Sequence, residues 1–109
     1  MKDDQLYLNH ILECAGKVKE YVKDGREKFL TSQVIQDAVL RNLQIMTESC
    51  QRFSQELKDR HPEVDWRGLT GFRNILVHDY LGIDLEIVWA LVDQKLSGLI
   101  KMAEAEITR

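Results

Sequence analysis

The chain has 109 residues, the length of one globular domain. Its composition, 44% hydrophobic and 30% charged, is that of a folded protein and argues against disorder. Its 6 glycines and 1 proline are too few for an all-β fold with many tight turns. Its net charge of −3 lacks the basic excess that nucleic-acid-binding domains usually carry, so any contact with RNA requires a local cluster of cations.

We expect a single domain over residues 1–109, located in the cytoplasm. The apolar runs are only a few residues long, so no membrane span is predicted, and the first residues lack the layout of a secretory signal. The two cysteines, Cys14 and Cys50, are too few for a disulfide framework and are expected to be buried thiols.

The first half of the chain predicts two amphipathic helices. The first is expected to stop at Gly25, which follows a basic turn. The second is capped by Thr31 or Ser32 and continues to about Asp59, before Pro62. Apolar residues with helical spacing define both. They are Leu8, Ile11, Leu12, Ala15, Val18 and Val22, then Ile35, Ala38, Val39, Leu43, Met46, Cys50, Phe53 and Leu57.

The second half predicts two further helices. Asp65 can cap the third, which contains Gly68 and Gly71. Each glycine costs about 1 kcal/mol of helix propensity relative to alanine, so we expect another backbone or a ligand to approach there. Gly82 breaks the chain, and Asp84 can cap the fourth helix. The apolar stripes are Leu69, Phe72 and Leu76, with Tyr80 as a further candidate, then Val88, Leu91, Val92, Leu96, Leu99, Ile100, Ala103 and Ile107.

Four amphipathic helices joined by short loops predict an all-α fold, an antiparallel four-helix bundle with five helices as the alternative. Trp66 and Trp89 are expected to anchor its core or a dimer interface. His10, Glu13 and Cys14 can share one turn of the first helix, but the sequence has no metal-binding spacing such as CxxC or HExxH. We therefore predict no metal site and no cofactor.

The segment from Gly71 to Tyr80 carries the residues best suited to chemistry on a phosphate. Arg73, Asn74, His78 and Tyr80 fall within eight positions. On one continuous helix, at about 100° per residue, Arg73 and Tyr80 nearly eclipse, and Asn74 and His78 lie about 40° apart. Arg73 and His78 differ by about 140°, so they converge on one ligand only if the helix end lines a groove or faces a second copy of itself.

These side chains can cleave RNA without a metal. His78 exchanges protons near neutral pH, Arg73 clamps a phosphate with a planar cation, and Asn74 orients the histidine or a phosphate oxygen. Arg73 would stabilise the phosphorane, and a second histidine from a dimer mate would complete the acid and base pair. The structural alternative is a capping and ion-pair network, in which Arg73 pairs with an acid such as Glu48.

The motif Arg73-Asn74-x3-His78-x-Tyr80 resembles the Arg–x4–His–x–Tyr signature of the HepT-like toxins. These toxins belong to the HEPN superfamily (higher eukaryote and prokaryote nucleotide-binding). The resemblance covers nearly the whole chain, including residues 7–12, 37–43, 66–67 and 80–89. The sequence departs from the family pattern at Asp65, where proline is frequent, and at residues 47–49, where a Gly-Glu-Ala-like step is frequent.

The resemblance implies a bundle that dimerises through its motif helices and acts as a metal-independent endoribonuclease on tRNA or mRNA. Such proteins are toxins of type VII toxin–antitoxin pairs. Arg73 and His78 would be catalytic, and Asn74 would assist them. The antitoxin would be a minimal nucleotidyltransferase of the MntA type, which neutralises the toxin by transferring AMP from ATP to the motif tyrosine, Tyr80. The resemblance also places Arg41 and Arg67 near the motif as RNA contacts.

Two other functions compete with this hypothesis. The first is a non-catalytic HEPN module that helps a nucleotidyltransferase present its substrate, which the net charge of −3 favours. The second is a plain helical oligomer whose polar cluster only caps a helix. That interpretation predicts that His78→Ala lowers stability and changes no activity.

Overall fold

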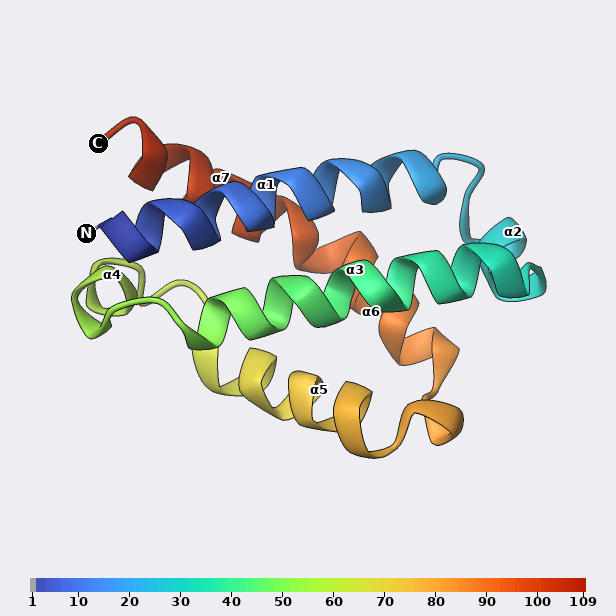
Figure 1. Ribbon diagram of the computed structural model, residues 1–109. Helices are drawn as coiled ribbons and strands as arrows, with labels where there is room; N and C mark the ends of the chain where they lie inside the picture. Colours follow the sequence, from blue (N-terminus) through green and yellow to red (C-terminus); the bar gives the residue numbers. More distant parts are fainter. Residues whose placement is uncertain (1) are drawn as a thin grey trace.

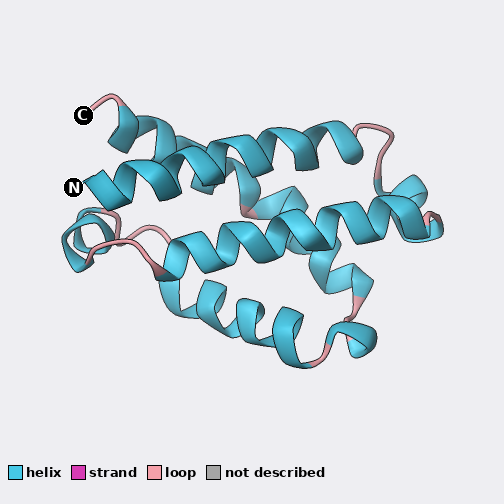
Figure 2. Ribbon diagram, viewed as in Figure 1, coloured by secondary structure: helices cyan, strands magenta, loops and turns pink. Residues whose placement is uncertain are grey.

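The computed structural model describes residues 2–109, and every regular element in that range is helical (Figure 2). The all-α prediction is therefore confirmed. None of the helices between residues 2 and 109 combines the length and the apolar character that crossing a bilayer requires. The elements are α1 (Lys2–Tyr21), α2 (Arg26–Thr31), α3 (Gln33–Gln51), α4 (Gln55–Arg60), α5 (Trp66–His78), the 3-10 turn η1 (Tyr80–Gly82), α6 (Leu85–Gln94) and α7 (Leu96–Ile107).

Four long segments form the bundle: α1, α3, α5 and the bent pair α6–α7 (Figure 1). Helix α3 runs antiparallel to α1 on one side and to α5 on the other, so it is the central helix of this layer. Helix α7 packs on α1 and closes the bundle from behind. The short helices α2 and α4 lie at opposite ends of α3, where the chain turns.

The predicted apolar stripes form the core. Both cysteines are buried as expected, and Phe29 of α2 is fully enclosed with its ring centroid 5.7 Å from that of Trp89. The rings of Trp66 and Phe53 pack edge-on with their centroids 6.0 Å apart, and the Trp66 indole N–H donates to the carbonyl of His61. Trp66 thus packs the start of α5, and Trp89 the middle of α6, against the bundle, as expected of core anchors.

Local capping signals position three helices as predicted. The Ser32 hydroxyl accepts the N–H of Ile35 at the start of α3. Asp65 accepts the N–H of Gly68 at 3.0 Å and so begins α5, the helix that carries Arg73, Asn74 and His78. Asp84 caps α6 in the same way. Gly25 is the one described residue with positive φ, at 95°, and it begins α2, a helix that the sequence pattern did not predict.

The predicted continuous helix to Asp59 is wrong, because the chain leaves helical geometry between α3 and α4. The buried carboxylate of Asp4 accepts both the N–H and the hydroxyl of Ser54, at 2.8 and 2.6 Å. The Ser54 hydroxyl oxygen in turn accepts the N–H of Leu57 and begins α4. A contact across 50 residues therefore sets this break, and the periodicity of α3 alone cannot reveal it.

The expected single fourth helix is bent at Lys95, which separates α6 from α7. Its N–H still donates to Leu91 at 2.8 Å and its carbonyl accepts from Leu99 at 3.3 Å. Lys95 therefore keeps helical hydrogen bonds through both its N–H and its carbonyl although the helix is interrupted there.

The corner before α5 is held by Glu106, a buried carboxylate at the end of α7. The Arg60 guanidinium donates to it, which lowers the pKa of Glu106, and the imidazole of His61 lies 3.3 Å away. This ion pair fixes the entry of α5 at one end of the bundle, so the motif end of α5 extends toward the other end.

Candidate active site

Arg73 is a half-buried cation of α5 without a carboxylate partner among residues 3–109. Its Nη1 donates to the side-chain oxygen of Asn74 at 3.3 Å, and its Nε is buried without a hydrogen-bond partner. The predicted alternative, an Arg73–Glu48 ion pair, does not form, because Glu48 instead accepts from Gln44. A buried N–H without an acceptor costs free energy, so this guanidinium is suited to receive an anion.

Asn74 and His78 lie on the exposed face of the same helix. They are i and i+4 neighbours on a continuous helix, so their side chains are adjacent. His78 occupies the last turn of α5, and its imidazole has no hydrogen bond or ion pair with the described residues. Its ring nitrogens are therefore available for contact with a bound molecule.

Arg73 and His78 do not meet on one chain. Helix α5 is regular between them, so they are separated by about 140° around the axis and about 7.5 Å along it. A small ligand cannot contact both along one face. The pair can act on one phosphate only if a second molecule, or a second copy of the chain, completes the site.

Tyr80 does not continue the helix, so the predicted eclipse with Arg73 is wrong. Helix α5 ends at His78, and Asp79 leaves helical geometry with φ −141° and ψ 46°. Tyr80 then begins η1. The motif tyrosine is consequently placed by the turn and by its neighbours, and not by the period of α5.

The neighbour that sequence reasoning missed is Asp37, near the start of α3. The Tyr80 hydroxyl lies 3.4 Å from its Oδ1 and donates to it. Partial burial raises the pKa of Tyr80, and the Asp37 charge and hydrogen bond raise it further. Because 43 residues separate the two, no local spacing predicts the contact.

The two other predicted cations are exposed but lie in different places. Arg67 begins α5 and shares a face with Asn74 and His78, since eleven residues return to within about 20° on a helix. Arg41 lies on α3 beside α1, where its charge and that of Lys17 partly offset the rise that burial causes in the pKa of Cys14. The structure therefore places Arg67 on the face of α5 that carries Asn74 and His78, and Arg41 on α3 one helical turn after Asp37.

The comparison with known proteins decides the family. A model of the family described as "Ribonuclease HepT-like" matches residues 11–106. The chain belongs to the HepT-like ribonuclease family.

Curated relatives agree with the HepT-like assignment. "Putative RNase MJ1380" of Methanocaldococcus jannaschii is 34% identical over 104 residues, which are 94% of this chain and 95% of that protein. "Probable ribonuclease HepT" of Thermococcus cleftensis is 32% identical over 94 residues, or 85% and 86% of the two chains. "Gamma-glutamylcyclotransferase and putative RNase MJ0434" of M. jannaschii is 36% identical, and the match spans 90% of this chain but 45% of that protein. No solved structure gives a significant match.

The two glycines of α5 in this HepT-like chain have different explanations. A Cβ on Gly68 would lie 2.2 Å from the Asp65 carboxylate, so Gly68 makes room for the helix cap. A Cβ on Gly71 would meet no atom within 4 Å. Nothing described in the chain itself therefore requires a glycine at Gly71, which lies on the exposed face between Arg67 and Asn74.

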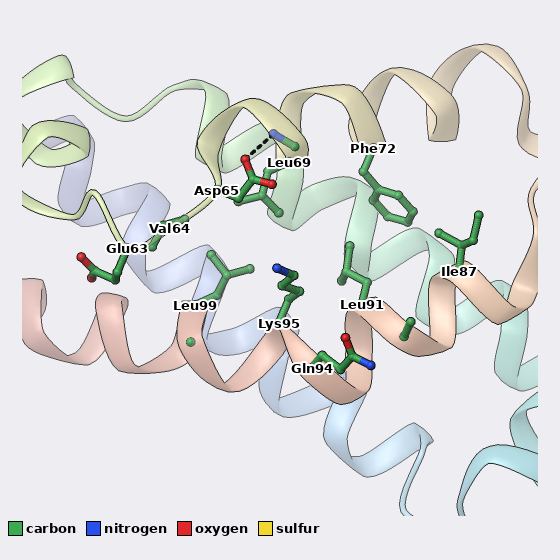
Figure 3. Close-up of a pocket in the computed structure, with 13 residues that line it drawn as sticks. Glu63, Val64, Asp65, Leu69, Phe72, Ile87, Leu91, Gln94, Lys95 and Leu99 are labelled. Carbon is green, nitrogen blue, oxygen red and sulfur yellow. Dashed lines mark hydrogen bonds between the residues drawn. The ribbon is translucent and has the colours of Figure 1, made fainter.

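An apolar groove of about 510 Å³ lies between α5 and the α6–α7 segment of the HepT-like bundle (Figure 3). Asp65 and Lys95 stand among its apolar side chains. None of the described residues that line the groove is a predicted site residue. Phe72 faces the groove, and the Arg73 side chain leaves α5 about 100° further around the helix, so it points elsewhere. The apolar side chains are Val64, Leu69, Phe72, Ile87, Ala90, Leu91 and Leu99.

Proposed function

We propose that this HepT-like chain is a metal-independent endoribonuclease, the toxin of a type VII toxin–antitoxin pair, with tRNA or mRNA as its substrate. One observation carries the proposal. The Arg73 guanidinium has no carboxylate partner among the described residues and donates to Asn74. Asn74 in turn precedes the exposed His78 by one helical turn. Because the chain belongs to a ribonuclease family, we infer that the anion bound by this unpaired cation is an RNA phosphate.

The reaction that suits these groups is attack of a ribose 2′-hydroxyl on the adjacent phosphate. One His78 takes the hydroxyl proton, and a second imidazole protonates the 5′ oxygen as its bond to phosphorus breaks. Arg73 neutralises the charge that develops on the phosphorane oxygens, while Asn74 orients Arg73 through their hydrogen bond. The products are a 2′,3′-cyclic phosphate and a free 5′-hydroxyl.

The second imidazole would come from a second copy of the chain. The separation of Arg73 and His78 supports this, because a single α5 cannot turn both toward one phosphate. Exposed apolar side chains around the motif also support it, since large exposed apolar residues commonly mark interfaces. They are Ile75, Val77, Leu81 and Ile87.

We further propose that RNA follows the exposed face of α5. Arg67 and His78 lie about 16 Å apart along the axis, so an RNA strand that contacts both would follow most of the length of α5. Gly71 lies between them with open space where its Cβ would be. Arg41 would then make a peripheral contact to the RNA backbone from α3.

Replacing Gly71 with alanine should separate stability from activity. The free energy of unfolding is expected to rise by about 0.5–1 kcal/mol, because alanine has the higher helix propensity and meets no atom of the chain. RNA cleavage is expected to fall severalfold, because the new methyl group projects into the path of the RNA or the second copy. Gly16→Ala in α1 is the matched control, as Gly16 also has open space. Equal cleavage by both variants would argue against a ligand on this face.

Control of the toxin would act through Tyr80, two residues after His78. We propose that an MntA-like minimal nucleotidyltransferase transfers AMP to the Tyr80 hydroxyl. Tyr80 as a whole residue is 40% exposed, which leaves it open to an enzyme. The added phosphate brings a negative charge to the end of α5 that carries Arg73, and the nucleoside obstructs the approach of RNA.

Tyr80→Phe tests this control directly. The variant is expected to cleave RNA at a rate within about twofold of the original chain, because only the hydroxyl contact to Asp37 is lost and such a surface hydrogen bond stabilises little. Incubation with the antitoxin, ATP and Mg²⁺ should silence the original chain but not the variant. Tyr7→Phe is the matched control and should still be silenced. Neutralisation of Tyr80→Phe with no AMP on the chain would rule out the modification.

The alternative function is the non-catalytic HEPN module, favoured by the net charge of −3. It predicts that unmodified protein cleaves neither total RNA nor purified tRNA, while it still binds a nucleotidyltransferase. The two functions therefore differ in one measurable activity of the same preparation.

A further inference from the structure

Tyr80 is tied to the rest of the bundle by one polar contact. It begins η1, whose next residue, Leu81, is 100% exposed, so the turn itself is not packed against the core. The Tyr80 hydroxyl nevertheless lies 3.4 Å from Oδ1 of Asp37, in the second turn of α3. The other tyrosines, Tyr7 and Tyr21, make no hydrogen bond to any carboxylate among the described residues. The contact therefore distinguishes Tyr80 from the other two phenols of the chain.

Asp37 is free to act as a proton acceptor. Its carboxylate is exposed and has no other hydrogen bond or ion pair with the described residues. The 3.4 Å separation is long for an O–H···O hydrogen bond, but such bonds commonly shorten when a catalytic complex forms. A free carboxylate at this distance can act as a general base once the contact shortens to about 2.6–3.2 Å in the catalytic complex.

The environment of Tyr80 favours the protonated phenol, so a proton acceptor would assist a reaction at its oxygen. Partial burial, together with the charge of Asp37 and its hydrogen bond, raises the pKa of Tyr80. The phenol is therefore protonated at neutral pH, and its oxygen cannot attack as a preformed phenolate. The proton has to leave during the attack itself, which is the step that an adjacent carboxylate accelerates.

We propose that Asp37 positions the Tyr80 hydroxyl and accepts its proton when Tyr80 is adenylylated; this inference rests on the proposed modification of Tyr80. In the step, the Tyr80 oxygen bonds to the α-phosphorus of ATP. The bond from that phosphorus to the oxygen that bridges to the β-phosphate breaks, and pyrophosphate leaves with the electron pair. The phenolic proton passes to Asp37 and then to water, so the toxin contributes a residue to its own neutralisation.

The experiment compares three chains as substrates of a minimal nucleotidyltransferase from the same genome, with Mg²⁺ and ATP radiolabelled at the α-phosphate. Asp37→Asn keeps an acceptor oxygen but cannot take up a proton. Its initial labelling rate at neutral pH is expected to fall by about tenfold or more. Asp93→Asn is the matched control, since Asp93 is an exposed carboxylate of α6 without hydrogen bonds or ion pairs among the described residues. It should be labelled at the original rate.

The pH dependence separates proton transfer from mere positioning. The ratio of the Asp37→Asn rate to the original rate cancels the enzyme's own pH profile. That ratio is expected to increase as the pH rises and Tyr80 ionises without help. A ratio near one at neutral pH, or a reduced ratio that stays constant with pH, would overturn the role of Asp37. If the original chain acquires no AMP on Tyr80, the proposed modification fails first and the role of Asp37 with it.

A second measurement tests the contact in the isolated chain. The ring carbons of the three tyrosines can be titrated by NMR, with Tyr7 and Tyr21 as internal references. The pKa of Tyr80 should decrease in Asp37→Asn, because the carboxylate that raises it is gone. An unchanged titration of Tyr80, with the fold intact, would show that Asp37 does not hold the hydroxyl in solution.

Discussion

Replacing His78 with alanine is expected to abolish RNA cleavage while the bundle stays folded. General acid–base catalysis by a positioned side chain contributes about 100-fold to 10,000-fold, so the variant should lose at least about 100-fold in rate. The structural cost should be small. His78 is exposed in the last turn of α5, its imidazole makes no hydrogen bond with the described residues, and a cation at a helix C-terminus contributes at most about 1 kcal/mol.

Cleavage rate and melting temperature should be measured together for this variant and for His10→Ala. His10 is half-buried on α1 and packs edge-on against Tyr7, away from α5. The control is expected to keep its cleavage and to lose more stability than His78→Ala. A His78→Ala chain that unfolds, or that cleaves RNA at the original rate, would support the interpretation in which the polar cluster only caps a helix.

Reversing the charge of Arg73 should have an effect of similar size. Removing one preorganised electrostatic donor usually lowers a rate by about 100-fold to 1,000-fold, and a carboxylate in its place would also repel the phosphate. Arg73→Glu is therefore expected to cleave no detectable RNA. No ion pair is lost from the described residues, so the free energy of unfolding should decrease only moderately.

Two further variants separate charge from geometry. Arg73→Lys keeps the positive charge but not the planar pair of donors, and should retain a few per cent of the activity. Arg109→Glu makes the same charge reversal at an exposed terminal residue and should change nothing. Full activity in Arg73→Lys would refute the bidentate clamp. If Arg73→Glu instead lost its activity because it unfolded, Arg73 would have a structural role and not a catalytic one.

The sequence predicted those features that depend on near neighbours. Ser32, Asp65 and Asp84 cap helices as expected, because a cap needs only the three residues that follow it. The buried stripes were predicted for the same reason, since their period is a property of one helix. The residues of the motif were selected from their chemistry and from the resemblance to the HepT-like toxins, and their roles stay a prediction.

The features that were missed depend on distant contacts. Asp4 breaks the second helix by binding Ser54 from 50 residues away, and Asp37 reaches Tyr80 across 43 residues. The predicted helix extended past the observed end of α5, because nothing in the periodic pattern of the sequence marks Asp79 as a stop. In the structure the backbone of Asp79 leaves helical geometry. Each error follows from tertiary contacts or backbone geometry that outweigh a local preference.

Unmodified protein is expected to cleave RNA without a metal, and a single incubation can show whether it does. Purified protein should first be weighed intact by mass spectrometry, because AMP already present on Tyr80 would mimic inactivity. It should then be incubated with tRNA and with total RNA in the presence of a metal chelator. We expect cleavage that leaves 2′,3′-cyclic phosphate ends. Intact RNA after incubation with unmodified, dimeric protein would contradict the account and favour the non-catalytic partner module.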